Sequence, residues 1–418
     1  MRVAMLARAV YPLHGYGGVE RHVYHLSTHL ARLGAEVHLW VQNVPDGATD
    51  RFPAGILLHP VRYNRTSPWL RPNSIVGRQI NYPLYSWAIG KEAAAWVRTR
   101  RVDLVHAQGL AAFGYGWLRA HDASLRLAAP MIMNPHGMEE YKTPSWTKRL
   151  AYLPFRALYS YGARCADRVI ATDACTRHEV PRYLGVDESR VVVLPSAIDV
   201  AECLSPLDPA RQHALRQRLG LEGAPLVLLS VSRLERNKGF HLLAEALAGV
   251  QERLPPGWRW VIVGEGKERA HLEAQVRRLG LAPATCFAGR LDDAELHNLY
   301  EVVDLFVHPT LYEGSSLVVL EAMIHRRPVL ATAAGGIPDK VFDGRNGRLV
   351  PPGNVTALRE GLLWLLERRA QWPAMGVEGE RIVRERFDWP VVARATWEVY
   401  QEMLGRRSAP DAPGPRPA

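Results

Sequence analysis

The sequence predicts two α/β domains in tandem, each with a parallel sheet of the doubly wound type. Three observations point to this fold class. The chain has 418 residues, and at about 100–200 residues per domain that length predicts two or three domains. Short apolar runs of strand length alternate with stretches of helical periodicity, as in parallel sheets covered by helices. This alternation starts at residue 3 and starts again near residue 226.

Composition supports a globular protein and excludes several other classes. Hydrophobic residues make up 47% of the chain and charged residues 22%, close to the globular average, which excludes disorder, collagen and coiled coil. No run of 18 apolar residues occurs, and Arg8 interrupts the N-terminal apolar segment, so we expect a cytoplasmic protein without a transmembrane helix. The cysteines form no CxxC pair, which predicts reduced thiols and no structural zinc; they are Cys165, Cys175, Cys203 and Cys286.

The first domain is predicted at residues 1–203 and opens with a βαβ unit. Its first elements follow in order as a strand at 3–7, a loop with Gly15, Gly17 and Gly18, a helix at 19–33 ended by Gly34, and a strand at 37–41. Further strands are expected at 104–106, 131–134, 169–171 and 191–194.

A second domain, predicted at residues 204–387, repeats this pattern. Its predicted strands are 226–231, 260–263, 285–288, 305–307 and 328–331. Its predicted helices are a charged helix at 211–218, then 240–254, 268–279, one opened by Asp292, 316–324 and 354–369. An amphipathic helix follows at 388–404, and residues 405–418, with four prolines and no apolar pattern, are expected to be disordered.

Two glutamates eight positions apart, Glu313 and Glu321, lie on either side of a predicted loop-to-helix junction. The backbone N–H groups of Ser316 and Leu317 at the start of that helix would act as anion donors, with the helix dipole behind them. The pattern therefore indicates two carboxylates beside a phosphate site. The alternative is that Ser315 only caps the helix and that Glu321 is a solvated helix residue.

A second motif, Ser230–Gly239, follows the first strand of the second domain, at the carboxyl end where open α/β sheets bind ligands. Arg233 and Lys238 flank this loop, and Lys238 is one of only six lysines in the chain. A bidentate guanidinium and a point-charge ammonium together neutralise a leaving diphosphate without a metal ion. The alternative is a solvated loop with two basic residues.

Together these residues resemble family 4 of the retaining, nucleotide-sugar-dependent glycosyltransferases with the GT-B fold. The motifs run in the order of that family from about residue 15 to 355 and cover nearly the whole chain. They are Gly17-Gly18-Val19-Glu20, Pro135-His136-Gly137, Arg233 to Lys238-Gly239, Glu313 to Glu321, Gly335-Gly336-Ile337-Pro338 and Gly347 to Gly353.

The resemblance implies roles for individual residues. It implies that Glu321 binds the donor ribose and that Glu313 contacts the donor sugar near the reacting centre. Arg233 and Lys238 would hold the diphosphate and stabilise it as a leaving group. His136 would contact the transferred sugar, unless it is only a structural residue of its loop. The other donor-binding positions that the resemblance implies are Gly17, Gly18, Gly314, Ser316 and Leu317.

The resemblance also implies an architecture and a chemistry. Two Rossmann-like domains would form an interdomain cleft that closes on the substrates, and helix 388–404 would pack back on the first domain. The reaction would retain the anomeric configuration, with the leaving phosphate helping to deprotonate the acceptor and no protein nucleophile. The nucleotide sugar is a co-substrate, so no cofactor and no metal are expected.

One segment departs from the family pattern. Where relatives often read Pro-Asn-Gly followed by Ile or Val and Asp, this chain has Ser196 and Ala197 after Pro195. The role of that loop therefore does not carry over. The base pocket has no clear signature either, although Gly289-Arg290-Leu291 is suitably placed for backbone contacts to the base, and we expect a UDP-sugar in preference to a GDP-sugar.

Basic charge is concentrated in the first half of the chain. The formal net charge is +10, and residues 1–200 hold 24 basic against 15 acidic residues, an excess of nine. Basic residues and aromatics interleave at 62–101 and 141–168, a composition typical of a surface that binds anionic lipid. The alternatives are solvated helix faces with buried aromatics, or a site for an acidic soluble acceptor. Nucleic acid is not expected, since no binding motif accompanies the charge.

Three functions follow as hypotheses. The first is a glycosyltransferase that acts on a glycolipid, lipid-linked or other glycan acceptor at the cytoplasmic membrane face. An alternative form of this hypothesis has a small soluble acidic acceptor, such as a sugar phosphate. The second is a nucleotide-sugar epimerase of the same fold, which would need no acceptor. The third is a degenerate regulatory subunit, against which the intact set of charged motif residues argues.

Overall fold

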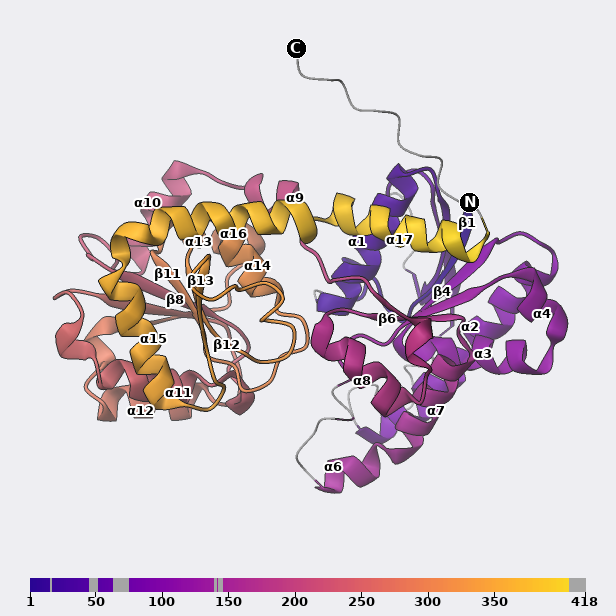
Figure 1. The fold of residues 1–418 in the computed structure, drawn as a ribbon, viewed down its shortest axis with the longest axis horizontal. Helices are drawn as coiled ribbons and strands as arrows, with labels where there is room; N and C mark the ends of the chain where they lie inside the picture. The colour runs from indigo at the N-terminus through magenta and orange to yellow at the C-terminus, as the bar shows by residue number, and fades with distance from the viewer. Residues whose placement is uncertain (16, 45–51, 63–74, 139–140, 142–145, 406–418) are drawn as a thin grey trace, which may run out of the picture. The chain divides into compact units, whose positions relative to one another are not determined.

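The computed structural model describes residues 1–15, 17–44, 52–62, 75–138, 141 and 146–405. The chain divides into two compact units, Met1–Pro195 together with Trp389–Ala418, and Ser196–Asp388. Each unit contains one parallel sheet covered by helices, which confirms the predicted α/β fold class (Figure 1). The predicted disorder at 405–418 concerns residues that, apart from Gly405, lie outside the described part of the chain.

The first unit contains a seven-stranded parallel sheet in the order β3-β2-β1-β4-β5-β6-β7. Its strands are β1 (Arg2–Leu6), β2 (Glu36–Gln42), β3 (Ile56–Val61), β4 (Leu104–Gln108), β5 (Met131–Asn134), β6 (Arg168–Ala171) and β7 (Val191–Val193). Its helices are α1 (Gly18–Arg32), α2 (Ile75–Arg98), α3 (Ala112–His121), α4 (Ala123–Ala128), α6 (Trp146–Ala151), α7 (Leu153–Cys165), α8 (Ala174–Leu184) and α17 (Trp389–Met403).

Strand alternation divides the side chains of this sheet between two faces. Ala4 and Leu6 of β1, with Val105 and Ala107 of β4, belong to the core cluster that α2, α3 and α7 complete. The residues between them, such as His106, therefore face the opposite side, where Tyr400 of α17 contacts His106.

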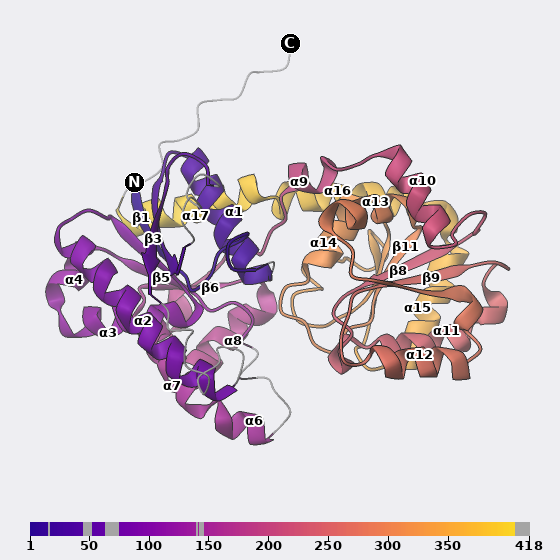
Figure 2. The ribbon, with the colours of Figure 1, turned by 180° about the vertical axis from the view of Figure 1, so that it is seen from behind.

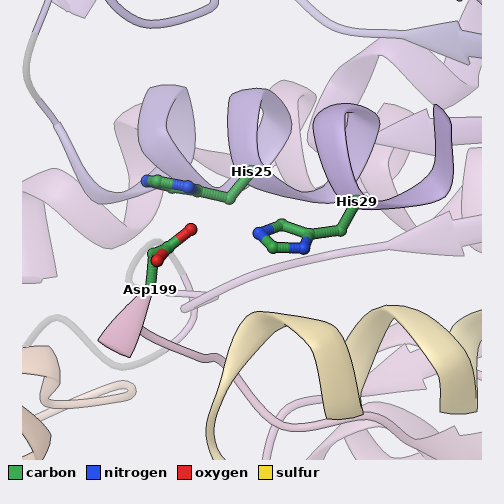
Figure 3. A group of neighbouring side chains, drawn as sticks. All are labelled: His25, His29 and Asp199. Atoms are coloured by element: carbon green, nitrogen blue, oxygen red, sulfur yellow. The ribbon is translucent and has the colours of Figure 1, made fainter. Parts of the chain in front are cut away.

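Helix α17 returns to the first unit and packs against α1. Histidines of α1 provide the contact: the rings of His25 and His29 stack on Trp389 at interplanar angles of 17° and 14°. Figure 3 shows both histidines projecting from the same side of α1. The spacing of four residues places them one helical turn apart, so a single indole can cover both rings.

The second unit contains a six-stranded parallel sheet in the order β10-β9-β8-β11-β12-β13. Its strands are β8 (Val227–Val231), β9 (Arg259–Val263), β10 (Thr285–Gly289), β11 (Leu305–His308), β12 (Val329–Thr332) and β13 (Gly347–Val350). Its helices are α9 (Val200–Leu204), α10 (Pro209–Arg218), α11 (Phe240–Ala248), α12 (Arg269–Arg278), α13 (Asp293–Val302), α14 (Leu317–Ile324), α15 (Val355–Glu367) and α16 (Trp372–Arg386).

Two hydrophobic clusters lie on the two faces of this sheet. Val227, Leu229 and Val231 of β8 belong to one cluster. Leu228 of β8 and Leu226, the residue before the strand, belong to the other. Helices α13, α14 and α16 cover the first face and α11, α12 and α15 the second (Figure 2). A strand buried on both faces reads as a continuous apolar run, which is why β8 is visible in the sequence.

The division between the units differs from the predicted boundary at 203/204. Residues 196–203 belong to the second unit because Ile198, Val200 and Cys203 lie in its core. The backbone N–H of Ile198 also donates to the carbonyl of Phe387 at 3.0 Å. The segment that carries Ser196 and Ala197 is thus anchored to the end of α16.

Several elements differ from their predicted extents. Strands β3 and β13 lie outside the predicted strands, because Pro60 in one and Gly347 and Arg348 in the other interrupt the apolar pattern. Helix α11 ends at Ala248 with Gly249 as its C-cap, short of the predicted end at Leu254. Helix α2 contains Pro83 and has little amphipathic periodicity, which explains why it is absent from the predicted helices.

Candidate functional site

The strand order of the second unit reverses between β8 and β11, and the loops that follow these two strands carry the predicted donor residues. In open α/β sheets ligands bind outside the carboxyl ends of the strands at such a reversal. The loop after β8 carries Arg233 and Lys238, and the loop after β11 carries Glu313 and Gly314. Figure 2 shows β8 and β11 side by side in this unit.

Lys238 and Glu313 form an ion pair between these loops. Nζ of Lys238 donates to Oε2 of Glu313 at 2.9 Å, and the lysine is 8% exposed. Nε2 of the fully buried His308, the last residue of β11, lies 3.1 Å from the same carboxylate oxygen. A lysine and an imidazole thus converge on one carboxylate at the reversal of the strand order.

This environment keeps Glu313 ionised. Burial alone would raise the pKa of Glu313, but the hydrogen bond from His308 and the positive charge of Lys238 outweigh burial and lower the pKa to about 2. Burial also lowers the pKa of His308, in opposition to the attraction of Glu313, so its imidazole is neutral near pH 7. The site therefore contains a carboxylate, an ammonium and a neutral imidazole.

Close backbone approaches hold the two loops. Gly239 follows Lys238 with φ of +72°, and a Cβ there would lie 1.9 Å from the carbonyl oxygen of Pro309. Gly335 has φ of +54°, and a Cβ there would lie 1.9 Å from the carbonyl oxygen of Glu313. Since only glycine fits both the conformation and the space, these glycines allow the backbone packing that positions Lys238 and Glu313.

A second buried lysine, Lys340, fixes the segment after Glu313. It is 1% exposed, and its Nζ donates to Oγ of Ser315 at 2.9 Å and to the carbonyl of Ser316 at 3.0 Å. Neither Lys340 nor His308 is among the residues that the sequence motifs single out for the site. The scarcity of lysine was a signal for Lys340, and the position at the end of a buried strand was a signal for His308.

Arg233 does not join the ion pair of Lys238 and Glu313. Its side chain is 70% exposed and its Nη1 donates to Oε1 of Glu235 at 2.7 Å. Arg233 thus lies in the same loop as Lys238, but its guanidinium forms an ion pair with Glu235 and not with Glu313.

Helix α14 begins directly after this loop, with Ser316 as its N-cap and Leu317 as its first residue. The helix start therefore lies where the sequence predicts it. One turn later, Oε2 of Glu321 accepts a hydrogen bond of 3.2 Å from the hydroxyl of Tyr300 in α13. Burial and the nearby Glu321 raise the pKa of Tyr300 well above its ordinary value, so Tyr300 stays a donor. Glu321 and Glu313 thus have separate partners.

In the first unit, His136 lies in the loop after β5 in a left-handed conformation with φ of +55°. Its backbone N–H donates to Oδ1 of Asn134 at 2.9 Å, and its Nε2 lies 2.8 Å from Oε1 of Gln108. Burial, together with His22 and His106, holds the pKa of His136 well below its ordinary value. A strained backbone that fixes a neutral imidazole is typical of functional loops.

Gly17 and Gly18 open helix α1, with Gly17 as the N-cap. A Cβ on Gly18 would meet nothing within 4 Å, whereas a Cβ on Gly17 would lie 2.3 Å from Oε2 of Glu20. Among the described residues of either unit taken by itself, no three histidine, cysteine or acidic side chains bring ligand atoms within 4.8 Å of one another.

The basic, aromatic segments of the first unit divide into core and surface. Several aromatics of 62–101 and 141–168 are core residues; Tyr85, Phe155 and Tyr159 are less than 9% exposed. The exposed large hydrophobic residues that the structure describes in these segments are Ile80, Leu84, Trp146, Leu150 and Leu153, with Trp146 71% exposed. Residues 63–74 and 142–145 of these segments lie outside the described part of the chain. No helix that the structure describes is long and apolar enough to cross a bilayer.

Comparisons with known proteins show the family of the chain. A family model described as Glycosyltransferase Family 4 matches residues 16–202, and one described as Glycosyl transferases group 1 matches residues 211–380. The chain is 30% identical to a glycogen synthase of Mycobacterium tuberculosis, covering all of this chain and 97% of the relative. It is 29% identical to D-inositol 3-phosphate glycosyltransferase 2 of Catenulispora acidiphila, covering 96% and 95%.

Solved structures share the fold. Anabaena Alr3699/HepE in complex with UDP superposes with a TM-score of 0.72 at 21% identity, covering 96% of this chain and all of that one. Sucrose-phosphate synthase from Thermosynechococcus elongatus has a TM-score of 0.73 at 22% identity, with coverage of 97% and 99%.

Proposed function

Because the chain belongs to glycosyltransferase family 4, we propose that it transfers a sugar, with retention of anomeric configuration, from a nucleotide diphosphate sugar to a hydroxyl acceptor. The observation that carries the proposal is the buried pair of Lys238 and Glu313 at the reversal of strand order in the second unit. In the second unit the proposed donor contacts are Arg233, Gly314, Ser316, Leu317 and Glu321. The donor contacts proposed from the first unit are Gly17, Gly18 and His136.

Charge complementarity supports a diphosphate at this place. The ammonium of Lys238 and the N-terminus of α14 both favour an anion, and the exposed Arg233 is free of packing constraints that would prevent it from turning toward one. Glu321, fixed by Tyr300, suits a ribose hydroxyl because an ionised carboxylate accepts hydrogen bonds only.

In the proposed reaction the acceptor oxygen bonds to the anomeric carbon on the face from which the diphosphate leaves. The bond between that carbon and the diphosphate oxygen breaks, and the hydroxyl proton passes to an oxygen of the leaving phosphate. Lys238 and Arg233 stabilise the developing phosphate charge, so that no metal ion is needed. Glu313, ionised through its contacts with Lys238 and His308, orients the donor sugar.

UDP is the proposed nucleotide. Its support is that Alr3699/HepE, which shares the fold, was solved in complexes with UDP and with UDP-glucose. A thermal-shift panel of UDP, GDP, ADP and their common sugars tests this proposal, and we expect the largest stabilisation from UDP and a UDP-sugar. If no nucleotide raises the melting temperature and none is released as product, the donor assignment fails.

A small acidic or glycan acceptor is the proposed acceptor class. Relatives named D-inositol 3-phosphate glycosyltransferase and glycogen synthase support it, as does the basic excess of nine in residues 1–200. A surface that binds lipid would need exposed aromatic residues. Three aromatics of the basic segments are buried instead, which weakens the hypothesis of a lipid-binding surface; they are Tyr85, Phe155 and Tyr159. Incubation of a UDP-sugar with inositol phosphates, sugar phosphates and oligosaccharides, followed by NMR of the product anomer, tests acceptor and retention together.

A lipid-linked acceptor at the cytoplasmic face of a membrane is the second candidate. The exposed Trp146, Leu150 and Leu153, on neighbouring helices of the first unit, favour it. Co-sedimentation with anionic vesicles across a salt series tests it, and absence of binding at every salt concentration would exclude it. Incubation with the donor alone tests for epimerase activity, which we do not expect.

A further inference from the structure

A chain of hydrogen bonds in the first unit runs from helix α17 to His136. The hydroxyl of Tyr400 lies 2.5 Å from Nδ1 of His106. Nε2 of Gln108 lies 3.1 Å from Nε2 of that histidine, and Oε1 of Gln108 lies 2.8 Å from Nε2 of His136. None of these partners is a motif residue of the sequence, and Tyr400 is 264 positions after His136 in the chain.

Strand geometry explains why these side chains meet. His106 and Gln108 are two residues apart on β4, so they project from the same face of the sheet. Met5 of β1 is paired in register with His106 and projects from that face too. Gln108 is in turn paired in register with Asn134 of β5, two residues before His136. Gln108, at the carboxyl end of β4, therefore lies beside the loop that carries His136.

Met5 and His106 together favour one orientation of the amide of Gln108. The amide Nε2 lies 3.1 Å from Sδ of Met5, a weak acceptor, and 3.1 Å from Nε2 of His106. An amide NH2 group has two hydrogens, and each finds an acceptor in this orientation. The reverse orientation would place the amide oxygen against the thioether sulfur, where two acceptors face each other. Oε1 of Gln108 is consequently the atom that faces His136.

This orientation fixes the tautomer of both histidines. Since Gln108 donates to Nε2 of His106, that nitrogen is unprotonated, and Nδ1 of His106 carries the hydrogen and donates to Tyr400. Oε1 of Gln108 can only accept, so Nε2 of His136 carries a hydrogen. Nδ1 of His136 is then an acceptor, and it has no hydrogen-bond partner among the residues that the structure describes.

The surroundings of His136 do not add a charge that would protonate it. His22 of α1 meets its ring edge to face at 5.0 Å, and burial lowers the pKa of His22 to about 4. Burial likewise lowers the pKa of His106, to about 3. The titratable groups that face His136 from α1 and β4 are thus neutral imidazoles at pH 7, and Tyr400 of α17 is a neutral phenol whose pKa burial raises.

We propose that Gln108, held by His106 and Tyr400, is a positioning residue that locks His136 in its Nε2–H tautomer and so presents Nδ1 as an acceptor to a hydroxyl group of the transferred sugar. The proposal rests on the proposed function for the contact between His136 and the sugar. It assigns helix α17 a part in the reaction that its place in the sequence does not reveal.

The direct test is nitrogen NMR of the full chain labelled with 15N-histidine at pH 7, with the His136 signals assigned by their loss in His136→Asn. We expect a neutral imidazole with the hydrogen on Nε2. A hydrogen on Nδ1 alone, or an imidazolium, would overturn the proposal. This measurement needs no substrate, so it is independent of the proposed function; a correct tautomer without sugar transfer from any donor would refute the function and leave the tautomer standing.

The kinetic test uses Gln108→Glu, which keeps the size of the side chain. Its carboxylate accepts from His136 but cannot donate to His106, and its charge raises the pKa of His136. We expect kcat/KM at pH 7 to fall about 10- to 100-fold and to recover as the pH rises and His136 loses its proton. An equal loss at every pH would indicate a merely structural role and overturn the proposal.

Tyr400→Phe and Tyr115→Phe form a matched pair. Their comparison separates an effect on the tautomer of His136 from a general effect of removing a buried tyrosine hydroxyl. Both residues are fully buried tyrosines of the first unit, but no partner for the hydroxyl of Tyr115 is present among the described residues. We expect Tyr400→Phe to give a mixture of His136 tautomers and Tyr115→Phe to leave the NMR signals of His136 unchanged. Identical spectra for the two variants would contradict a role for Tyr400.

Discussion

Nζ of Lys238 lies 2.9 Å from Oε2 of Glu313, although 75 positions separate the two residues in the chain. The contact exists because β8 and β11 are neighbours in the sheet and their following loops leave the same edge. Both partners are largely buried, with side chains 11% and 16% exposed. A buried pair of this kind is costly to break, because the remaining charge loses its partner in a poorly solvated place.

Glu313→Gln removes the negative charge between Lys238 and His308 and leaves the shape of the side chain. We expect kcat to fall by about 100-fold or more, because the proposed ionised contact of Glu313 with the donor sugar is lost in the reacting complex. Steady-state kinetics with a UDP-sugar measure this. The control is Glu378→Gln, which breaks exposed ion pairs of α16 in the same unit and should leave kcat unchanged. Equal kinetics for both variants would exclude Glu313 from the reaction.

The protein should become less stable as the pH is lowered below 4.5, because Glu313 then becomes protonated in the unfolded chain. Its pKa is about 2 in the folded chain and 4.5 as the ordinary value, so its contribution is present above pH 4.5 and is lost as the pH falls toward 2. That contribution is on the order of 3 kcal/mol. Denaturant unfolding of the wild type and Glu313→Gln at pH 7, 5, 4 and 3 measures it, and we expect the gap between the two to narrow below pH 4.5.

Lys340→Met should destabilise the second unit and weaken donor binding. The variant removes the hydrogen bonds that hold Ser315 and Ser316, so we expect a loss of about 2–4 kcal/mol and a higher KM for the donor. Lys267→Met is the control, since Lys267 is exposed in the same unit. Thermal unfolding and donor titration check the prediction, which a similar melting temperature for both variants would contradict.

Arg233→Ala should affect activity without affecting stability. The guanidinium is exposed and its pair with Glu235 contributes about 1 kcal/mol at most, so the melting temperature should stay within error. If Arg233 turns to the diphosphate during the reaction, kcat/KM should fall about 100-fold. Arg236→Ala, an exposed arginine of the same loop, is the control and should retain full activity.

Gly335→Ala should be more harmful than Gly280→Ala, although both glycines have a left-handed φ, of +54° and +73°. A Cβ at Gly280 meets nothing within 4 Å, so only backbone strain of about 1 kcal/mol is expected. A Cβ at Gly335 would lie 1.9 Å from the carbonyl of Glu313, so the loop of Glu313 must move. We expect the Gly335 variant to lose both stability and activity, as unfolding and kinetic measurements would show.

The amino-acid sequence alone predicts the parts of this protein that depend on local pattern. Buried parallel strands such as β5 and β8 read as apolar runs, and β5 lies at the predicted residues 131–134. The motif positions Lys238, Glu313 and Glu321 are also visible, because the order of strands and loops along the chain determines which residues follow each strand. Strands β3 and β13 were missed, because edge strands with Pro, Gly or Arg lack that pattern.

Tertiary structure decides what each motif residue contacts. The order of residues in the chain does not reveal that His308 and Lys238 both contact the carboxylate of Glu313. It does not reveal the ion pair of Arg233 and Glu235. Nor does it reveal the chain of hydrogen bonds that connects Tyr400 through Gln108 to His136. It does not reveal which aromatics of the basic segments are buried either. Phe155 and Trp146 are both aromatic residues of the same segment, but Phe155 is buried and Trp146 is exposed. These contacts depend on the pairing of strands far apart in the chain, which sets burial, and burial in turn sets charge state and hydrogen bonding.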